Sequence, residues 1–191
     1  SIIELSIALA IISIILVTSL AGVQRVLRSN NVNNDLRNIN LAVAALTSLA
    51  ATQTSTSGVT MGNLIGLKVF DGFAVNEAAG SVTNAFGGAI RVVSNSAIVD
   101  GYPQNSGFIL YSQNIPSEAC PDYINGISTL SPNISTTNVS GPAMNGAVFS
   151  GANTTALKTG GGTYSLPSLA AACTVTAANP KVTIAAFVGK T

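Results

Sequence analysis

The first fifty residues constrain the fold of this chain more than any other segment. Residues 5–23 form an uncharged and largely apolar run, and a single carboxylate, Glu4, precedes it. About nineteen residues at roughly 1.5 Å rise each make a helix close to the ~30 Å thickness of a bilayer core. This run is therefore long enough to span a membrane.

The apolar run differs from a removable secretory signal, which combines a basic start, a shorter apolar core and a small-residue cleavage site. Small and hydroxyl-bearing residues such as Ser13, Thr18 and Ser19 are spread through it. Such residues allow helices to pack closely in lipid. We therefore expect the run to belong to the working protein and to pack against other helices, with a plain membrane anchor as the alternative.

The helical pattern continues beyond the run, where apolar residues recur at spacings of four and three. They are Val32, Leu36, Ile39, Val43, Leu46 and Ala50. This spacing draws one apolar stripe along a helix. Because no proline occurs before Pro103, the sequence predicts one continuous helix to about Ala51, roughly 75 Å long. We expect residues 1–24 to form a membrane or filament-core half, residues 25–52 an amphipathic half, and residues 53–191 a globular head.

The composition excludes several functional classes. Only 8% of the 191 residues are charged and the net charge is +1, which gives no reason to expect a nucleic-acid partner or a strongly acidic substrate. The chain has no histidine, so it cannot form a Ser-His-Asp triad. Its seven acids are scattered and no GxxxxGK[ST] phosphate loop occurs. We predict a protein that is not an enzyme, with no catalytic residue, cofactor or metal.

The two cysteines, Cys120 and Cys173, enclose about fifty residues. We interpret them as a disulfide, because the bulk of the chain is expected outside the cytoplasm. Closing such a loop stabilises the fold by about 4 kcal/mol in the chain-entropy model. Two buried free thiols are the alternative, and a metal site is disfavoured because there is no histidine and no third cysteine.

The head has the pattern of an α+β domain with a small antiparallel sheet. Strands are predicted at 89–93, 97–99, 108–112 and 182–188, a helical turn at 74–79, and short helices at 116–125 and 167–173. Pro167 suits the first position of its helix, and Pro121 must lie in the first turn of its helix or bend it. Residues 64–73 are expected to be irregular, and residues 131–162 a turn-rich surface segment.

The segment Ser1-Ile-Ile-Glu4-Leu5, followed by an apolar helix, resembles the mature N-terminus of type IV pilins. These are filament subunits in which a long N-terminal helix packs on an antiparallel sheet. The family places its glutamate fifth, after an N-methylated first residue, whereas here it is fourth. We expect that one residue, the modified one, precedes Ser1.

The second half of the chain resembles the type IVb subclass. A strand, a helix with Cys120, a long segment, a helix ending in Cys173 and a final strand follow one another, and no proline lies near position 22. The resemblance implies a pilin fold in which the last strand inserts centrally and residues 120–173 form the variable surface.

The same resemblance implies a function. We expect the major subunit of an extracellular pilus that serves adhesion, cell–cell contact or conjugation. The subunit would be stored in the inner membrane of a bacterium, cut by a prepilin peptidase, and polymerised by the pilus assembly machinery into a helical homopolymer that can touch a host or recipient cell. The alternatives are a membrane-anchored extracellular binding module, a minor pilin and a type II secretion pseudopilin.

Glu4 is the residue on which assembly should depend. An ionised carboxylate in a lipid-like core is costly unless it is paired. The amino group of a neighbouring subunit's first residue is its natural partner, and such a pair would reward docking in register. Glu4 and Ser1 are therefore the expected assembly residues. The residues expected to pack the filament core are Leu5, Leu9, Ile12, Leu16 and Gly22.

Arg25, Arg28 and Arg37 form a cationic cluster beyond the apolar run. A solvated helix face is the simplest interpretation. Alternatively, these arginines pair between subunits with Asp35, Asp71 or Glu77, or touch lipid head groups before assembly.

Overall fold

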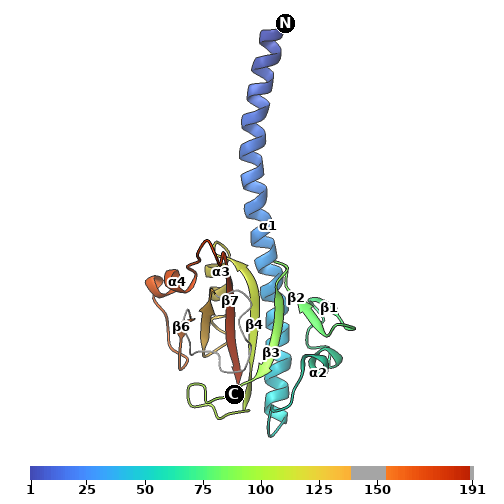
Figure 1. Ribbon diagram of the computed structural model, residues 1–191, viewed down its shortest axis with the longest axis vertical. Coiled ribbons are helices and arrows are strands. Elements are labelled where there is room, and N and C mark those ends of the chain that lie inside the picture. Colours follow the sequence, from blue (N-terminus) through green and yellow to red (C-terminus); the bar gives the residue numbers. More distant parts are fainter. Residues whose placement is uncertain (139–153, 190–191) are drawn as a thin grey trace.

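A computed structural model describes residues 1–138 and 154–189. One 51-residue helix, α1 (Ile2–Thr52), runs the length of the molecule, and its N-terminal half projects beyond the head (Figure 1). The predicted continuous helix is confirmed. Its end is set by Gln53, whose backbone is extended.

The head-bound half of α1 buries the predicted stripe. Val32, Ile39, Val43, Leu46 and Ala50 are buried, and Leu36 is half-buried against the same core. Two further residues on this face, Asp35 and Ala42, are also buried. The helix therefore docks through a face wider than the stripe that the apolar pattern identified.

The described part of the head is built around a seven-stranded antiparallel sheet. Its strand order is β1-β2-β3-β4-β7-β5-β6. Its centre consists of β3 (Ala89–Ser94), β4 (Gly107–Pro116) and β7 (Lys181–Gly189). These strands match the expected segments at 89–93, 108–112 and 182–188. The last strand lies between β4 and β5, so its central insertion is confirmed (Figure 1).

The segment 131–162, expected to be surface turns, instead contributes two strands. They are β5 (Ile134–Thr137), which pairs with β7, and β6 (Thr154–Lys158), which forms that edge of the sheet. Ile134, Ser135 and Thr136 are buried. The sequence did not predict β5 because its hydroxyl-bearing residues have low hydropathy. In the fold the hydroxyl of Thr136 is buried and donates to the Ala172 carbonyl oxygen at 2.6 Å. The rest of the segment, 139–153, lies outside the described residues.

The other edge of the sheet also departs from the predictions. The helical turn expected at 74–79 is wrong: β1 (Ala74–Asn76) pairs with β2 (Ser81–Thr83) in a short hairpin. Helix α2 (Met61–Gly66) overlaps the start of the segment expected to be irregular. The strand expected at 97–99 is reduced to one bridge between Val99 and Tyr102. Each of these elements is only a few residues long, which is too short for a clear periodicity.

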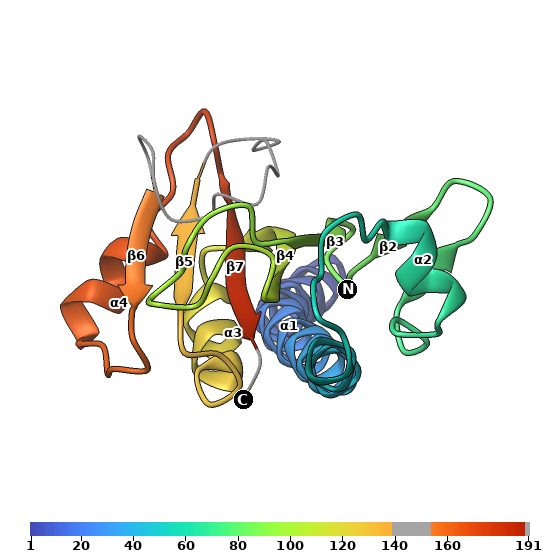
Figure 2. The same cartoon turned by 90° about the horizontal axis from the view of Figure 1, so that it is seen from below.

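Two short helices carry the cysteines. Helix α3 (Cys120–Ile127) and helix α4 (Leu166–Ala172) each have a proline in the first turn, as predicted for Pro167 and as one of the two alternatives for Pro121. The sulfur atoms of Cys120 and Cys173 are 2.02 Å apart and the Cα atoms 5.7 Å apart, so the disulfide is present. Seen along the long axis, α1 and α3 lie side by side on one face of the sheet (Figure 2).

The opposite face of the sheet has a smaller apolar cluster. Ile109, Tyr111 and Phe187 are buried there under Val99 and the half-buried Tyr102. The rings of Tyr102 and Phe187 lie 4.9 Å apart. The central strands are thus covered on both faces, and α1 is held against a fixed support.

Candidate assembly interface

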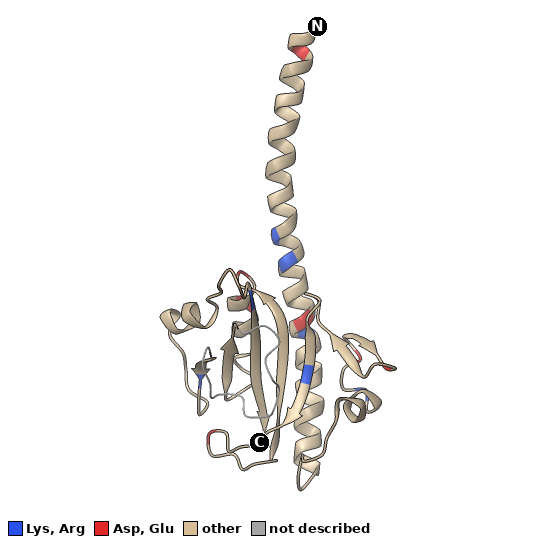
Figure 3. Ribbon diagram, in the orientation of Figure 1, with Lys and Arg blue, Asp and Glu red and all other residues tan. Residues whose placement is uncertain are grey.

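The projecting half of α1 is an apolar surface that the head does not cover. Fifteen large apolar side chains between residues 2 and 27 are more than half exposed. Among the described residues, α1 is the one helix long and apolar enough to cross a membrane. Charge is confined to the ends of this half, with one acidic position near the N-terminus and basic positions close to the head (Figure 3).

The hydroxyl groups of the projecting half are turned back onto the helix. Ser6, Ser13 and Thr18 donate to the carbonyl oxygens of Ile2, Leu9 and Ile14 at 2.8, 2.7 and 3.1 Å. Because each of these hydroxyls donates to a backbone carbonyl oxygen of its own helix, they add little polarity to the surface. The helix can therefore enter hydrocarbon or pack on other helices without leaving those hydroxyls unpaired.

The predicted core-packing residues lie along this surface. Leu5, Leu9, Ile12 and Leu16 are spaced four, three and four, so they share one face of the helix, and each is between 52% and 63% exposed. No atom lies within 4 Å of the Cβ position at Gly22, which leaves room for a neighbouring backbone. Contacts between copies stay a prediction for all five residues.

Glu4 and Ser1 lie at the tip of the helix. The amino group of Ser1 lies 3.2 Å from a carboxylate oxygen of Glu4, and both residues are exposed. Both predicted assembly residues therefore lie at the exposed end of α1. Pairing between neighbouring subunits stays a prediction.

Asp35 lies on the face of α1 that docks on the head, and only 1% of it is exposed. One carboxylate oxygen accepts the backbone N–H of Ala85 at 2.9 Å, and the other accepts the hydroxyl of Tyr123 at 3.3 Å. Asp35 is thus enclosed by its own head and unavailable to a neighbouring arginine. Asp35 was one of three acids suggested as arginine partners, and for Asp35 that suggestion is wrong.

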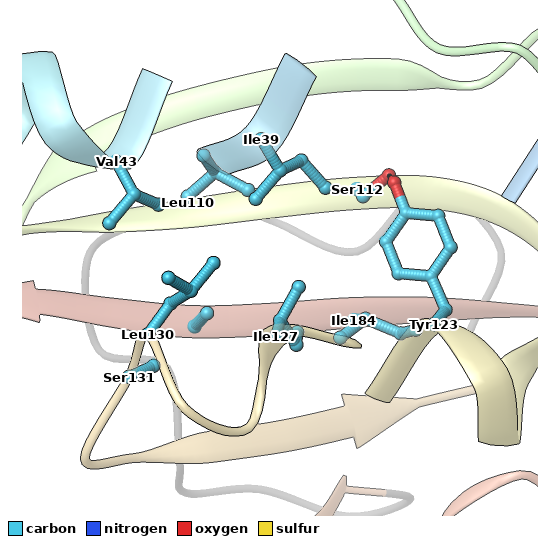
Figure 4. Close-up of a pocket in the computed structure, with 10 residues that line it drawn as sticks. Ile39, Val43, Leu110, Ser112, Tyr123, Ile127, Leu130, Ser131 and Ile184 are labelled. Carbon is cyan, nitrogen blue, oxygen red and sulfur yellow. Dashed lines mark hydrogen bonds between the residues drawn. The ribbon is translucent and has the colours of Figure 1, made fainter. Parts of the chain in front are cut away.

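Tyr123 connects Asp35 to the sheet. Its oxygen lies 2.8 Å from the Ser112 hydroxyl, and the Asn84 side-chain amide donates to the same Ser112 oxygen at 3.0 Å. Since Tyr123 donates to Asp35, Ser112 donates to Tyr123. The hydroxyls of Ser112 and Tyr123 point at each other beside the small cavity between α1, α3 and the sheet (Figure 4).

Burial changes the acidity of this pair. Desolvation raises the pKa of Asp35, and the hydrogen bonds from Ala85 and Tyr123 partly oppose that rise. Burial, followed by the nearby Asp35 charge, raises the pKa of Tyr123 well above its ordinary value. Tyr123 therefore stays protonated and can act as a donor to Asp35 over the physiological range.

The cavity beside Tyr123 is not a ligand site. It holds about 10 Å³, roughly the volume that one water requires. Apolar side chains such as Ile39, Leu110 and Ile184 dominate its lining (Figure 4). Across residues 1–138 and 154–189, no group of three or more Cys, Asp or Glu residues is placed to hold a metal ion.

Sequence reasoning missed the buried polar chain of Asp35, Tyr123, Ser112 and Asn84. A signal for Asp35 exists: it lies three residues after Val32, four before Ile39 and seven before Ala42. That spacing places a carboxylate on the apolar face. The other three residues come from separate segments, so no spacing in the sequence indicates that they meet.

The comparisons with known proteins agree with this architecture. A family model described as "PilS N terminal" matches residues 29–186. The chain belongs to the PilS family. Its match covers the docked half of α1, strands β1 to β6, most of β7 and both cysteines.

Two solved structures show the same fold as this PilS-family chain. The type IVb pilin from Salmonella typhi is 17% identical with a TM-score of 0.54, and covers 83% of this chain and 99% of its own. TcpA, a type IV pilin from the El Tor biotype of Vibrio cholerae, is 19% identical with a TM-score of 0.53, and covers 83% of this chain and 98% of its own. No curated protein sequence matches the chain. The chain thus has the type IV pilin fold, which is the fold of a pilus subunit.

Proposed function

We propose that this chain is the major structural subunit of an extracellular type IVb-like pilus. The observation that carries the proposal is the division of α1: its head-bound half is buried in the fold, while its projecting half is apolar and uncovered. Burying one leucine or isoleucine is worth about 1.5–3 kcal/mol. Fifteen large apolar side chains in water are therefore a strong drive towards lipid or towards other copies of the same helix.

The proposed subunit uses the two environments in turn. Before assembly, residues 1–24 lie in the inner membrane, which a helix of this length and composition can span. A prepilin peptidase processes the precursor and the assembly machinery extracts the subunit. In the filament, the helices of many subunits replace the lipid around each other, with Leu5, Leu9, Ile12, Leu16 and Gly22 at the contacts.

Glu4 sets the register of that packing. In the free chain its carboxylate is exposed and costs little. In an apolar filament core it needs a partner, and the amino group at the start of a neighbouring subunit supplies one.

The head forms the outer surface of the proposed filament. The disulfide fastens the end of α4 to the start of α3, and so ties the two ends of the region 120–173 to the same support as α1. That region would determine adhesion, contact with a host or recipient cell, and conjugation.

Imaging of sheared material from cells that express the full gene tests this function. Wild-type cells should yield filaments in which packed helices of ~10 Å diameter form the core and the heads surround it. Glu4→Ala and Glu4→Gln should reduce filament yield at least about tenfold, while the subunit accumulates in membranes at its normal level. Glu118→Ala, which removes an exposed acid from the head, is the matched control and should assemble normally.

Two results would contradict the proposal. If wild-type cells yield only detergent-soluble monomers, the chain is an anchored extracellular module. If Glu4→Ala enters filaments at the wild-type rate, the pairing of Glu4 between subunits is wrong, although the filament itself stands.

A further inference from the structure

The buried face of α1 repeats every seven residues, except at one position. Val32, Ile39 and Leu46 form one line of buried residues, and Leu36, Val43 and Ala50 form a second. A helix displaced by seven residues, about 10.5 Å, towards its N-terminus would bring Ile39 and Leu46 to the places of Val32 and Ile39, and so would present a similar apolar face to the sheet. The opposite displacement would bring Arg25 to the place of Val32. The apolar pattern therefore specifies the register of α1 only weakly against a displacement towards the N-terminus.

Asp35 breaks this repeat. The residue seven positions later, Ala42, is fully buried and apolar. A displacement that brought Ala42 to the place of Asp35 would leave the Ala85 N–H and the Tyr123 hydroxyl without their acceptor. The opposite displacement would carry the carboxylate into the apolar site of Ala42. Leaving a buried donor or a buried charge unpaired is costly in both cases.

The head holds both partners of Asp35 in fixed positions. Asn84 closes the β2–β3 turn by accepting the N–H groups of Phe86 and Gly88 at 3.0 and 2.9 Å. The same side chain donates to the Gln113 carbonyl oxygen at 2.7 Å, next to the bulge in β4. This turn presents Ala85, and α3, fastened by the disulfide at its first residue, presents Tyr123.

The chain after α1 does not by itself prevent the displacement. Thr56 is buried and donates to the Gly107 carbonyl oxygen at 2.9 Å, which fixes this point on the head. Between Thr52, the last residue of α1, and Thr56 the chain can span up to roughly 14 Å when extended. That length exceeds the roughly 10.5 Å of a seven-residue displacement and falls short of the roughly 21 Å of a fourteen-residue displacement.

We propose that Asp35 is a positioning residue that selects the register of α1 on the head. It acts as a single buried polar group does in a repeating helical interface, where it excludes alternatives that the apolar residues alone would allow. The register decides how far the tail projects, since a displaced helix would move Glu4 by about 10.5 Å relative to the head. This inference concerns one chain and does not depend on the proposed filament.

Cysteine pairs can report the register directly. A Cβ atom at Gly72 would lie 3.2 Å from the Cβ of Asn38. A small adjustment brings that separation into the disulfide range of about 3.5–4.5 Å, and Asn38→Cys removes the amide group that would otherwise collide with it. Asn38→Cys with Gly72→Cys therefore reports the observed register. Ala45→Cys or Asn31→Cys with Gly72→Cys reports a displacement of seven residues in either direction.

The three reporter pairs are oxidised in the full chain in detergent micelles, and the linked peptides are quantified by mass spectrometry. With Asp35 present, only the 38–72 link should form. Asp35→Leu should raise the ratio of displaced to observed links at least about tenfold. Asp35→Asn should keep the original pattern, because its amide oxygen can accept from Ala85 and its amide N–H can donate to Tyr123. Asn34→Leu, the same kind of change at the neighbouring exposed position, is the matched control and should also keep the pattern.

Tyr123→Phe removes a partner of Asp35 without altering α1, and should also raise the displaced links. It decides the matter if Asp35→Leu fails to fold. The proposal is overturned if Asp35→Leu folds and gives only the 38–72 link. If Asp35→Leu does not fold, the proposal is overturned when Tyr123→Phe gives only the 38–72 link. The apolar shape of the face would then be sufficient to set the register.

Discussion

The two halves of α1 are made of similar residues and have opposite environments. Leu46 in the docked half is fully buried, whereas Leu16 in the projecting half is 63% exposed. The docked half has polar residues on its outer face and contributes to the core of the head, while the projecting half is apolar all round and contributes nothing to it. A helix that is apolar on every side needs an apolar environment on every side. The contrast shows that one half of α1 serves the fold and the other serves contacts outside it.

Deletion of residues 1–28 tests the contrast most severely. We expect a soluble monomeric head whose melting temperature is close to that of the head in the full chain, because the deleted residues make no contact with the core. Filament formation and membrane association should be lost completely. Circular dichroism melts and analytical ultracentrifugation measure both outcomes, and an unfolded head would show that the projecting half supports the fold.

Reduction of the disulfide should weaken the head and leave the projecting half unchanged. The bond closes a loop of 53 residues, for which the chain-entropy model gives about 4 kcal/mol. Urea unfolding of the truncated head with and without reductant measures this loss. A loss below about 1 kcal/mol would mean that the packing of α3 and α4 holds the region without the bond.

Matched leucine substitutions compare the two halves directly. Leu46→Ala removes a fully buried side chain and should lower the free energy of unfolding of the head by about 2–5 kcal/mol. Leu16→Ala should change it by less than about 0.5 kcal/mol, since that side chain touches only its own helix. Both variants are compared by urea unfolding of the full chain in detergent. Equal losses would contradict the division of α1.

The smallest expected effect is a pH dependence of the free energy of unfolding, which arises from Asp35 in the docked half. Burial raises the folded-state pKa of Asp35 above its unfolded value of about 4. A raised pKa means that the folded state binds the proton more tightly than the unfolded state does. The contribution of protonated Asp35 to the free energy of unfolding is therefore fully present below the pKa of the unfolded state. It is lost as the pH rises through the pKa of the folded state.

The variant Asp35→Asn isolates this contribution, because it cannot ionise. The free energy of unfolding of the wild type, measured relative to Asp35→Asn, should fall as the pH rises from about 4 towards neutrality. An unchanged or rising difference would show that the carboxylate is better stabilised in the folded state than its burial indicates. Asn34→Ala serves as a control for helix propensity.

The sequence predicted those parts of the fold in which periodicity is long and apolar. The single helix, the stripe that includes Ile39 and Leu46, and the strands around Phe108 and Phe187 all have clear patterns. The strand around Ser135 was not predicted, because its buried hydroxyls look like surface residues. Asp35 was considered only as a partner for an arginine of a neighbouring subunit, although its spacing lies on the apolar face.

A cryo-electron microscopy reconstruction of the assembled filament tests the central claim most directly. We expect residues 5–23 of every subunit to pack around the filament axis, with the heads outside. Leu5, Leu9, Ile12 and Leu16 should contact neighbouring helices. A filament whose core is formed by the heads, with residues 5–23 still exposed or left in lipid, would contradict this claim.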